Sequence, residues 1–469
     1  MFTRLNLRLR IFLFFCLMAV GGAALAGGAL YYGWTRGGGS PAGPFITAFA
    51  IFAFLNTGLA VAVWLLFDEN IAKPINRLAA DLRLRAHAGV DKGLDAEAAR
   101  YLGDLAPAAS AMSSHLSTSV MSTASQVAQE TARLQAETAR LTALLTEIPL
   151  ATILANPADE IVLYDGQAAG VLSAVAPPRL KAPLGDYFSM TELIAAQDQR
   201  ATRGGEVAFA LYDRNRRTSY PARLKGLEGG GYMLVIDVQG ADLPPAPRPL
   251  VFDFELLNTS VASDVMETPL RDLCFVAFDT ETTGLSVEKD AVIQLGAVRI
   301  LNGRLVAGEQ IDTFVDPKRP IPPASTAVHH ITDDDVRGAP DFATAGRAFH
   351  HFARDAVLVA HNAPFDLGLL RKGAEEMGVT WDHPVLDTVL LSAVVFGTTE
   401  THTLDALCDR LSITIPPEAR HTAFGDALAT GQALVKLLPL LQARGHTTFG
   451  EVIAQTRKHG RLLKDMNAG

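Results

Sequence analysis

The stretch Cys274-Phe-Val-Ala-Phe-Asp-Thr-Glu-Thr-Thr-Gly284 decides how the C-terminal half of this chain is interpreted. Its first residues are apolar, as in a buried β-strand, and its last residues predict a tight turn. Alternate side chains of a strand face the same side, so Asp279 and Glu281 are expected to point the same way. Two carboxylates on one face repel each other unless a cation lies between them. The stretch therefore indicates a cation site at the end of a strand.

A second acidic segment follows the predicted strand end Leu358-Val-Ala360. In His361-Asn-Ala-Pro-Phe-Asp366, Asn362 suits a helix N-cap and Pro364 suits the first helical turn. This arrangement places Asp366 in the opening turn, where its side chain is aimed back across the strand ends.

A third segment is His421-Thr-Ala-Phe-Gly-Asp-Ala427. Asp426 starts an apolar helix that is expected to run to about residue 440, and His421 lies in the preceding loop. Further strands are predicted at 291–300 and 308–315. Four carboxylates and one histidine are therefore expected to reach one centre from separate elements.

These segments give the region from about Leu273 to Leu440 a family resemblance. The region resembles the DEDDh exonucleases, and its motifs are most similar to those of the epsilon proofreading subunit of bacterial replicative polymerases. The three motifs are Phe278–Leu285, Asn362–Asp366 and His421–Asp426. One departure is His329-His-Ile-Thr332, where relatives usually carry His-Gly-Ile-Thr. The resemblance implies an α/β ribonuclease-H-like fold, in which helices flank both sides of a mixed sheet.

The resemblance also implies a two-metal mechanism with two Mg²⁺ or Mn²⁺ ions, which carboxylates prefer. Two such ions about 4 Å apart can bind the attacking and the leaving oxygen of a phosphodiester. By resemblance, Asp279 bridges the ions, Glu281 and Asp426 complete the site of the nucleophilic water, and Asp366 supports the second ion. His421 is then the general base. The product is a nucleoside 5′-monophosphate.

Substrate contacts are expected from residues beside these carboxylates. Asp387 and His361 are expected to be structural, and His350 and His351 are expected to lie on the surface. The expected substrate-binding residues are Thr280, Thr282, Leu285, Asn362 and Phe365.

The N-terminal region, 1–68, is predicted to form a transmembrane hairpin with spans at about 11–34 and 45–67. The stretches 11–35 and 37–67 contain no charged residue, and each is long enough to cross a bilayer. Basic residues flank the outer ends of both spans, and only Arg36 lies between them. The positive-inside rule therefore places both termini in the cytoplasm of a bacterial inner membrane. The alternative is a cleaved signal sequence followed by one anchor, because Ala24-Leu-Ala-Gly-Gly28 resembles a cleavage site.

Two helical segments are predicted after the hairpin. Residues 69–118 resemble a HAMP linker, with a juxtamembrane amphipathic helix as the alternative. Residues 119–148 carry a heptad pattern from Val120 to Ile148, which predicts a parallel coiled coil and therefore a homodimer. The alternative for this helix is packing against its own domain.

The middle of the chain, 149–240, reads as two strands, short helices and three strands, with a turn at 156–159. This order resembles a PAS domain, which serves either as a ligand sensor or as a scaffold without a ligand. A Pro-rich linker, 241–268, precedes the exonuclease-like domain at 269–445 and a tail at 446–469. The net charge of −9 argues mildly against extensive duplex binding. The three cysteines show no zinc or disulfide spacing.

The sequence therefore predicts a membrane-anchored, metal-dependent 3′–5′ exonuclease that acts on nucleic acid 3′ ends, with single-stranded DNA as the expected substrate. Thr280 between the carboxylates and Thr282-Thr-Gly284 after them resemble the DNA-proofreading branch. One alternative is an exonuclease directed at RNA or oligoribonucleotides. Another is a membrane sensor that uses the nuclease domain as its output module. The sequence leaves association with a polymerase open.

Overall fold

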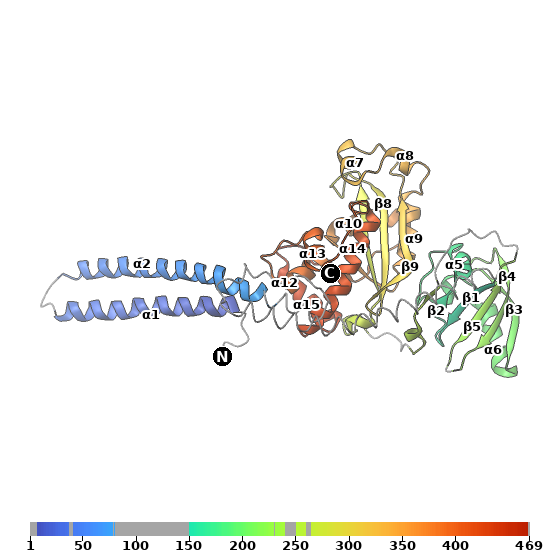
Figure 1. Cartoon of the computed structure of the whole chain (residues 1–469), viewed down its shortest axis with the longest axis horizontal. Helices are drawn as coiled ribbons and strands as arrows, with labels where there is room; N and C mark the ends of the chain where they lie inside the picture. The colour runs from blue at the N-terminus through green and yellow to red at the C-terminus, as the bar shows by residue number, and fades with distance from the viewer. Residues whose placement is uncertain are drawn as a thin grey trace, which may run out of the picture. The chain divides into compact units, whose positions relative to one another are not determined.

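The computed structural model places the chain in two units, 1–122 and 123–469, and each is described separately (Figure 1). The predicted coiled coil and the predicted HAMP-like segment from residue 80 onward lie outside the described residues. The structure describes residues 7–36, 41–77, 79, 150–228, 230–239, 250–258 and 264–467.

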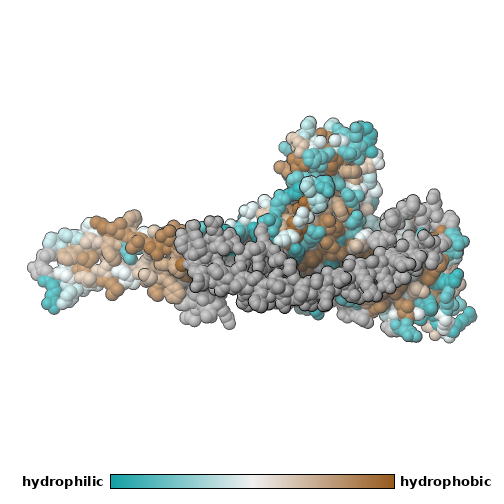
Figure 2. Space-filling model, in the orientation of Figure 1, coloured by the Kyte–Doolittle hydropathy of each residue, from teal (hydrophilic) through white to brown (hydrophobic). Residues whose placement is uncertain are grey.

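The first unit contains an antiparallel pair of apolar helices, α1 (Leu7–Arg36) and α2 (Gly43–Phe67), and α2 continues into a π-helical turn at Asp68–Ala72. Both Nε and Nη2 of Arg8 donate to the Asp68 carboxylate at 2.6 Å. In the middle of the pair, Nδ2 of Asn56 donates to the carbonyl oxygen of Ala19 at 2.8 Å. The segments 11–36 and 43–77 each contain an 18-residue window with a mean hydropathy of 2.1, and both segments are long enough to span a membrane. Their exposed surface is largely hydrophobic (Figure 2).

The second unit begins with an antiparallel sheet domain whose strand order is β3-β4-β5-β1-β2-β6. The turn expected at 156–159 is present, and Oδ1 of Asn156 accepts from the backbone N of Ala158 and Glu160 at 3.0 and 2.9 Å. Asp165 caps the first helix by accepting from the backbone N of Ala168 at 2.7 Å. The elements are β1 (Leu150–Ala155), β2 (Ile161–Tyr164), α5 (Gly166–Ser173), α6 (Met190–Arg203), β3 (Glu206–Tyr212), β4 (Ser219–Gly226), β5 (Tyr232–Asp237) and β6 (Val251–Phe252).

The C-terminal domain is built on a five-stranded mixed sheet with the order β11-β10-β7-β8-β9. β10 pairs in parallel with β7 and β11, whereas β8 is antiparallel to both β7 and β9. This sheet agrees with the expected ribonuclease-H-like fold. The strands are β7 (Phe275–Thr282), β8 (Val292–Leu301), β9 (Arg304–Phe314), β10 (Val357–Ala360) and β11 (Val385–Asp387).

Helices cover both faces of this sheet, as expected. α14 (Ala423–Ala443) contacts β7 and β8 on one face. α9 (Phe342–Phe352) lies on the other face, where the rings of Phe278 and Phe349 are 5.1 Å apart. The remaining helices are α7 (Pro323–His329), α8 (Asp333–Val336), α10 (Ala363–Lys372), α11 (Ala374–Met377), α12 (Thr388–Phe396), α13 (Leu404–Arg410) and α15 (Phe449–Thr456).

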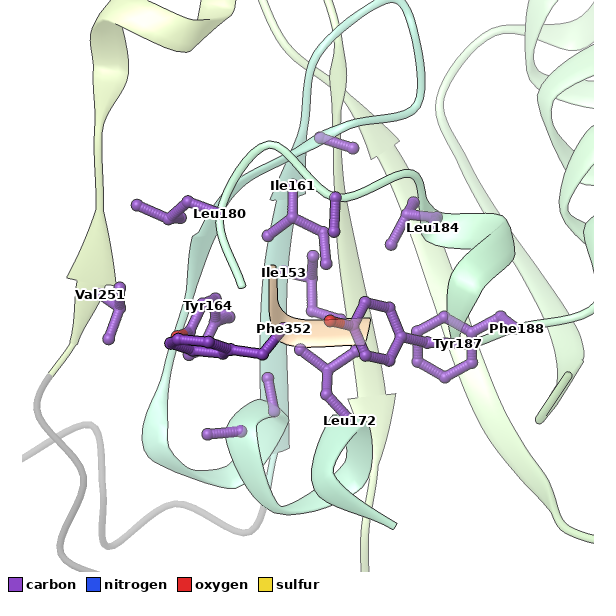
Figure 3. Packing of buried hydrophobic residues seen from close by; sticks show 14 of the residues in the cluster. Ile153, Ile161, Tyr164, Leu172, Leu180, Leu184, Tyr187, Phe188, Val251 and Phe352 are labelled. Atoms are coloured by element: carbon purple, nitrogen blue, oxygen red, sulfur yellow. The ribbon is translucent and has the colours of Figure 1, made fainter. Parts of the chain in front are cut away.

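The antiparallel sheet domain and the C-terminal domain share a buried hydrophobic cluster. Phe352, at the end of α9, belongs to this cluster together with Tyr164 and Tyr187 of the sheet domain (Figure 3). A buried ion pair lies in the same region, with Nε of Arg299 2.9 Å from Oε2 of Glu309. Tyr164 donates to Oε1 of Glu309 at 3.1 Å. The contacts of β8 and β9 therefore include polar partners from the other domain.

The prediction of a surface position is wrong for His351, whereas His350 is half-buried and its Nε2 lies 3.1 Å from the carbonyl oxygen of Thr380 in an exposed contact. The His351 side chain is 12% exposed, and its ring lies 5.4 Å from that of Tyr187. The His350 ring lies 5.0 Å from Trp381. The side chains of these adjacent residues point in different directions from the end of α9, but each ring packs against an aromatic ring from another part of the chain.

Candidate active site

Three of the predicted carboxylates meet at one point. Asp279, Glu281 and Asp426 each offer an oxygen, and these atoms lie within 4.8 Å of one another. Asp279 and Glu281 are the two half-buried positions of an otherwise buried strand, β7, which agrees with the expected shared face. An all-oxygen, all-anionic donor set suits a hard divalent cation such as Mg²⁺ or Mn²⁺. The residues present therefore fit the metal that the family resemblance implies.

The third carboxylate arrives because α14 crosses the sheet closely. Gly296 on β8 is the cross-strand partner of Asp279. A Cβ atom at position 296 would overlap the backbone of Ala423, so a larger residue there would push the helix away from the sheet. Asp426 lies in the first turn of this helix and is thereby brought over β7. The position of Asp426 in the site therefore requires a glycine at position 296.

Gln294, which was not predicted as a site residue, fixes the start of α14. Its Nε2 donates to Asp312 at 2.9 Å, and its Oε1 accepts from the backbone N of Ala423 at 3.1 Å. Gln294 is also the cross-strand partner of Glu281. A polar residue within an apolar strand was the visible signal in the sequence. Its partner, Ala423 at the start of α14, is distant in the chain, so the contact could not be predicted.

Asp366 lies in the first turn of α10, as expected, and is buried against β7. Its Oδ1 accepts from the backbone N and the hydroxyl of Thr280 at 3.1 and 2.5 Å. Burial raises the pKa of Asp366 to about 7, and the hydrogen bonds from Thr280 oppose that rise. Its charge also helps to raise the pKa of Asp279. Asp366 therefore adjoins the three-carboxylate group and is held by Thr280, and its role at a second cation stays a prediction.

The carboxylates are electrostatically frustrated in the absence of a cation. Burial raises the pKa of Glu281 to about 8, with further contributions from the charges of Asp426 and Asp366. Burial also raises the pKa of Asp279, and the neighbouring carboxylates add to the shift. A bound cation would favour the charged forms and reverse these shifts.

Arg420 is a second residue that was not predicted as part of the site. Its Nη1 lies 2.7 Å from both carboxylate oxygens of Asp426. Its Nε and Nη2 donate to the two oxygens of Asp405 at 2.7 and 2.8 Å. Its position immediately before His421 in the third motif was a visible signal, but its partners could not be read from the sequence.

His421 lies in the loop before α14, with an exposed side chain and a φ of 58°. Its charge is among the contributions that act on the pKa of both Asp426 and Asp405, so it adjoins the acidic group. An exposed imidazole beside the carboxylates can reach an attacking water. Its role as the general base stays a prediction.

The five predicted substrate-binding residues differ in accessibility. Thr280 and Thr282 are buried, and the Thr282 hydroxyl donates to the carbonyl oxygen of Gly284 at 2.6 Å. Leu285 is 93% exposed, Asn362 is exposed and Phe365 is half-buried. Leu285 and Asn362 are thus the most accessible to a nucleotide, and substrate contact stays a prediction for all five.

The neighbouring residues Asp387 and His361 have structural partners, as expected. Asp387 accepts from the backbone N of Val389 at 2.8 Å and of Ala363 at 2.7 Å, so it caps the starts of both α12 and α10. Asn362 does occupy the N-cap position of α10, but its side chain makes no capping hydrogen bond and its φ is 75°. Nδ1 of His361 lies 2.8 Å from the Thr388 hydroxyl oxygen.

Comparisons with known proteins identify the family to which the C-terminal domain is similar. The model of the RNase T exonuclease family matches residues 276–434. The "DNA polymerase III subunit epsilon-like protein" of Rhodobacter capsulatus is 34% identical, and the match covers 99% of this chain and 100% of that protein. The "DNA polymerase III PolC-type" of Halalkalibacterium halodurans is 33% identical over 51% of this chain and only 16% of its own length. Among solved structures, E. coli exonuclease I in complex with a dT13 oligonucleotide matches with a TM-score of 0.33 and 20% identity, covering 37% of this chain and 42% of that one.

Proposed function

Because the chain belongs to the DNA polymerase III epsilon-like proteins and is a metal-dependent 3′–5′ exonuclease of the DEDDh family, we propose that it releases nucleoside 5′-monophosphates from the 3′ ends of single-stranded DNA. The observation that carries this proposal is the meeting of Asp279, Glu281 and Asp426, whose oxygens lie within 4.8 Å of one another.

The proposed ligands are Asp279, Glu281 and Asp426, with Asp366 supporting a second ion. Two divalent cations at such a site neutralise charge on the phosphodiester and lower the pKa of the attacking water. Thr280 holds the Asp366 carboxylate, and Gln294 holds the start of the helix that carries Asp426. These two contacts fix the positions of α10 and α14, which carry Asp366 and Asp426, relative to the strands of the sheet. The protein's contribution is thus a set of ligands whose positions are fixed before substrate arrives.

His421 is the proposed general base. It lies in a loop at the exposed edge of the carboxylate group, where water and substrate have access. In this role the imidazole accepts a proton from the attacking water as the P–O bond forms. The leaving oxygen is the 3′ oxygen of the preceding nucleotide, so the released product keeps the phosphate on its 5′ oxygen.

DNA is the proposed substrate because Thr280 separates the carboxylates and Thr282, Thr283 and Gly284 follow them, a pattern similar to that of DNA-proofreading enzymes. The names of the relatives also refer to DNA polymerase III. The test uses the full chain in detergent with Mg²⁺ on 5′-labelled DNA and RNA strands of equal sequence, duplex DNA and dinucleotides. Stepwise shortening of single-stranded DNA that keeps the 5′ label is expected. Faster degradation of RNA or of dinucleotides would favour an oligoribonucleotide-directed enzyme instead.

We further propose that the α1–α2 hairpin crosses the inner membrane with both chain ends in the cytoplasm. Its exposed apolar surface and the lengths of segments 11–36 and 43–77 support a span. The Arg8–Asp68 pair joins the two outer ends of the hairpin, where basic residues gather in the sequence. A reporter fused after Gly469 should be active in the cytoplasm, and activity confined to the periplasm would contradict the orientation.

The segments between the membrane and the nuclease domain are proposed to regulate nuclease activity or to join two copies of the chain in a dimer. The order of elements in the antiparallel sheet domain supports a PAS-like assignment. The heptads between 119 and 148 support a parallel homodimer through a coiled coil. Light scattering in detergent should show a dimer that a Leu134→Glu, Leu141→Glu variant loses. A monomeric wild-type chain would remove the dimer proposal and leave the nuclease assignment intact.

A further inference from the structure

The guanidinium of Arg420 is shared between a carboxylate of the active site and one outside it. Nη1 lies 2.7 Å from each of the two oxygens of Asp426, so it is bound between them. The opposite edge of the guanidinium makes a two-bond contact with Asp405, at 2.7 and 2.8 Å. Asp405 stands in the first turn of α13 and is 65% exposed in its side chain. Planar, two-bond contacts of this kind are among the strongest that arginine makes.

The loop before α14 holds Arg420 at this position. The backbone N of Arg420 donates to the carbonyl oxygen of Pro416 at 3.2 Å, and that of Thr422 donates to Ala419 at 3.3 Å. A Cβ atom at Gly425 would overlap the Ala419 carbonyl oxygen, so the loop folds tightly onto the helix start. The backbone is therefore constrained, and the freedom of Arg420 lies in its side chain.

Arg420 acts on more of the site than its direct partner. Its positive charge is among the causes that lower the pKa values of Asp279 and Glu281, against the rise that burial produces. A divalent cation held by these carboxylates and by Asp426 would have the same effect. It would also repel a guanidinium lying against the same Asp426 oxygens. The two positive charges therefore compete for one carboxylate.

We propose that Arg420 is an internal counter-ion of the active site that competes with the divalent cation for Asp426, and that Asp405 retains Arg420 when the cation displaces it. The proposal rests on the assignment of Asp279, Glu281 and Asp426 as metal ligands under the proposed function. In this arrangement, removal of Arg420 strengthens cation binding. Removal of the Asp405 charge has the opposite effect, because Arg420 then has only Asp426 as its partner.

The test measures binding of Mn²⁺ alone, without nucleic acid, to the full chain in detergent by titration calorimetry. Arg420→Gln should bind Mn²⁺ about tenfold more tightly than wild type, since a net charge-assisted hydrogen bond of ordinary strength corresponds to about that factor. Asp405→Asn should bind it several-fold more weakly. The double variant should match Arg420→Gln, because without the arginine the Asp405 charge has nothing to retain. Arg337→Gln, which removes an exposed positive charge that is paired with Asp334, should leave Mn²⁺ affinity unchanged.

Two results would overturn the proposal. Weaker Mn²⁺ binding by Arg420→Gln would mean that the arginine orients Asp426 for the metal, and unchanged binding would mean that it does not compete. Circular dichroism verifies folding, and the surface variant Asp405→Asn gives an independent answer if Arg420→Gln fails to fold. The variant Asp279→Asn tests the metal-ligand assignment separately from the role of Arg420. If that variant binds Mn²⁺ as the wild type does, the metal-ligand assignment itself fails.

Discussion

Substitution of Glu309 by Gln perturbs the buried contact between the antiparallel sheet domain and the C-terminal domain. Both members of the Arg299–Glu309 pair are almost fully buried, with side chains 1% and 0% exposed and an Nε to Oε2 distance of 2.9 Å. Glu309 also accepts from Tyr164 and from the backbone N of Leu180, both in the sheet domain. A Gln side chain can keep one acceptor for these donors, but its amide nitrogen would face Arg299.

The expected loss is large because one buried charge is left without its partner. Breaking a buried ion pair by removing one member costs about 3–5 kcal/mol of unfolding free energy. Arg299 keeps its hydrogen bonds to the carbonyl oxygens of Phe352 and Leu180, at 2.8 and 3.2 Å, which favours the lower end of that range. A cost near 3 kcal/mol is a large part of the stability of an ordinary domain.

The assay is urea unfolding of the full chain in detergent, together with hydrogen exchange at the Leu180 amide, which donates to Glu309. Glu206→Gln is the matched control, because its pair with Arg223 spans 3.5 Å and both side chains are exposed. That control should cost at most about 1 kcal/mol. If Glu309→Gln destabilised the protein no more than Glu206→Gln and left Leu180 exchange unchanged, the inference that this contact is buried and stabilising would be refuted.

Two further predictions concern the site and its support. In the metal-free protein the pKa of Glu281 is about 8, against an ordinary value of 4.5. The folded state therefore holds more protons than the unfolded state between these values, and thermal stability should fall as pH rises across that window. Melting curves in EDTA should show this fall and curves in Mg²⁺ should show much less of it; identical profiles would contradict the electrostatic reasoning. Asp387→Ala should lower the unfolding free energy by about 0.5–2 kcal/mol for each of the two helix starts it caps, measured by urea unfolding, and wild-type stability would show that these caps contribute little.

Much of the site could be predicted because its signals are local. The alternation of β7 placed Asp279 and Glu281 on one face, and the first turns of α10 and α14 carry Asp366 and Asp426 as expected. In each case the local backbone conformation places the acidic residue on one face of a strand or in the first turn of a helix. The mixed sheet with helices on both sides was expected from the family resemblance, and the structure has this arrangement.

The parts of the site and fold that could not be predicted depend on contacts between segments that are distant in sequence. Arg299 and Glu309 are charged residues within strands, and a strand pattern alone suggests that such residues face solvent. Their burial follows from the packing of another domain over them. The helix cap expected from Asn362 is supplied by Asp387 instead, since the end of β11 lies beside the start of α10. Gln294 and Arg420 likewise acquire their roles from partners that tertiary structure brings to them.

The central claim is that Asp279, Glu281 and Asp426 form the metal-dependent hydrolytic centre, and one measurement tests it most directly. The rate of mononucleotide release from 5′-labelled single-stranded DNA in Mg²⁺ is compared for wild type, Asp279→Asn, Asp426→Asn and Asp334→Asn. The first two variants should lose more than about a hundredfold in rate, equivalent to about 3 kcal/mol of transition-state stabilisation. Asp334→Asn, which changes an exposed carboxylate on α8, should retain the wild-type rate. Wild-type release by folded Asp279→Asn and Asp426→Asn proteins would contradict the account.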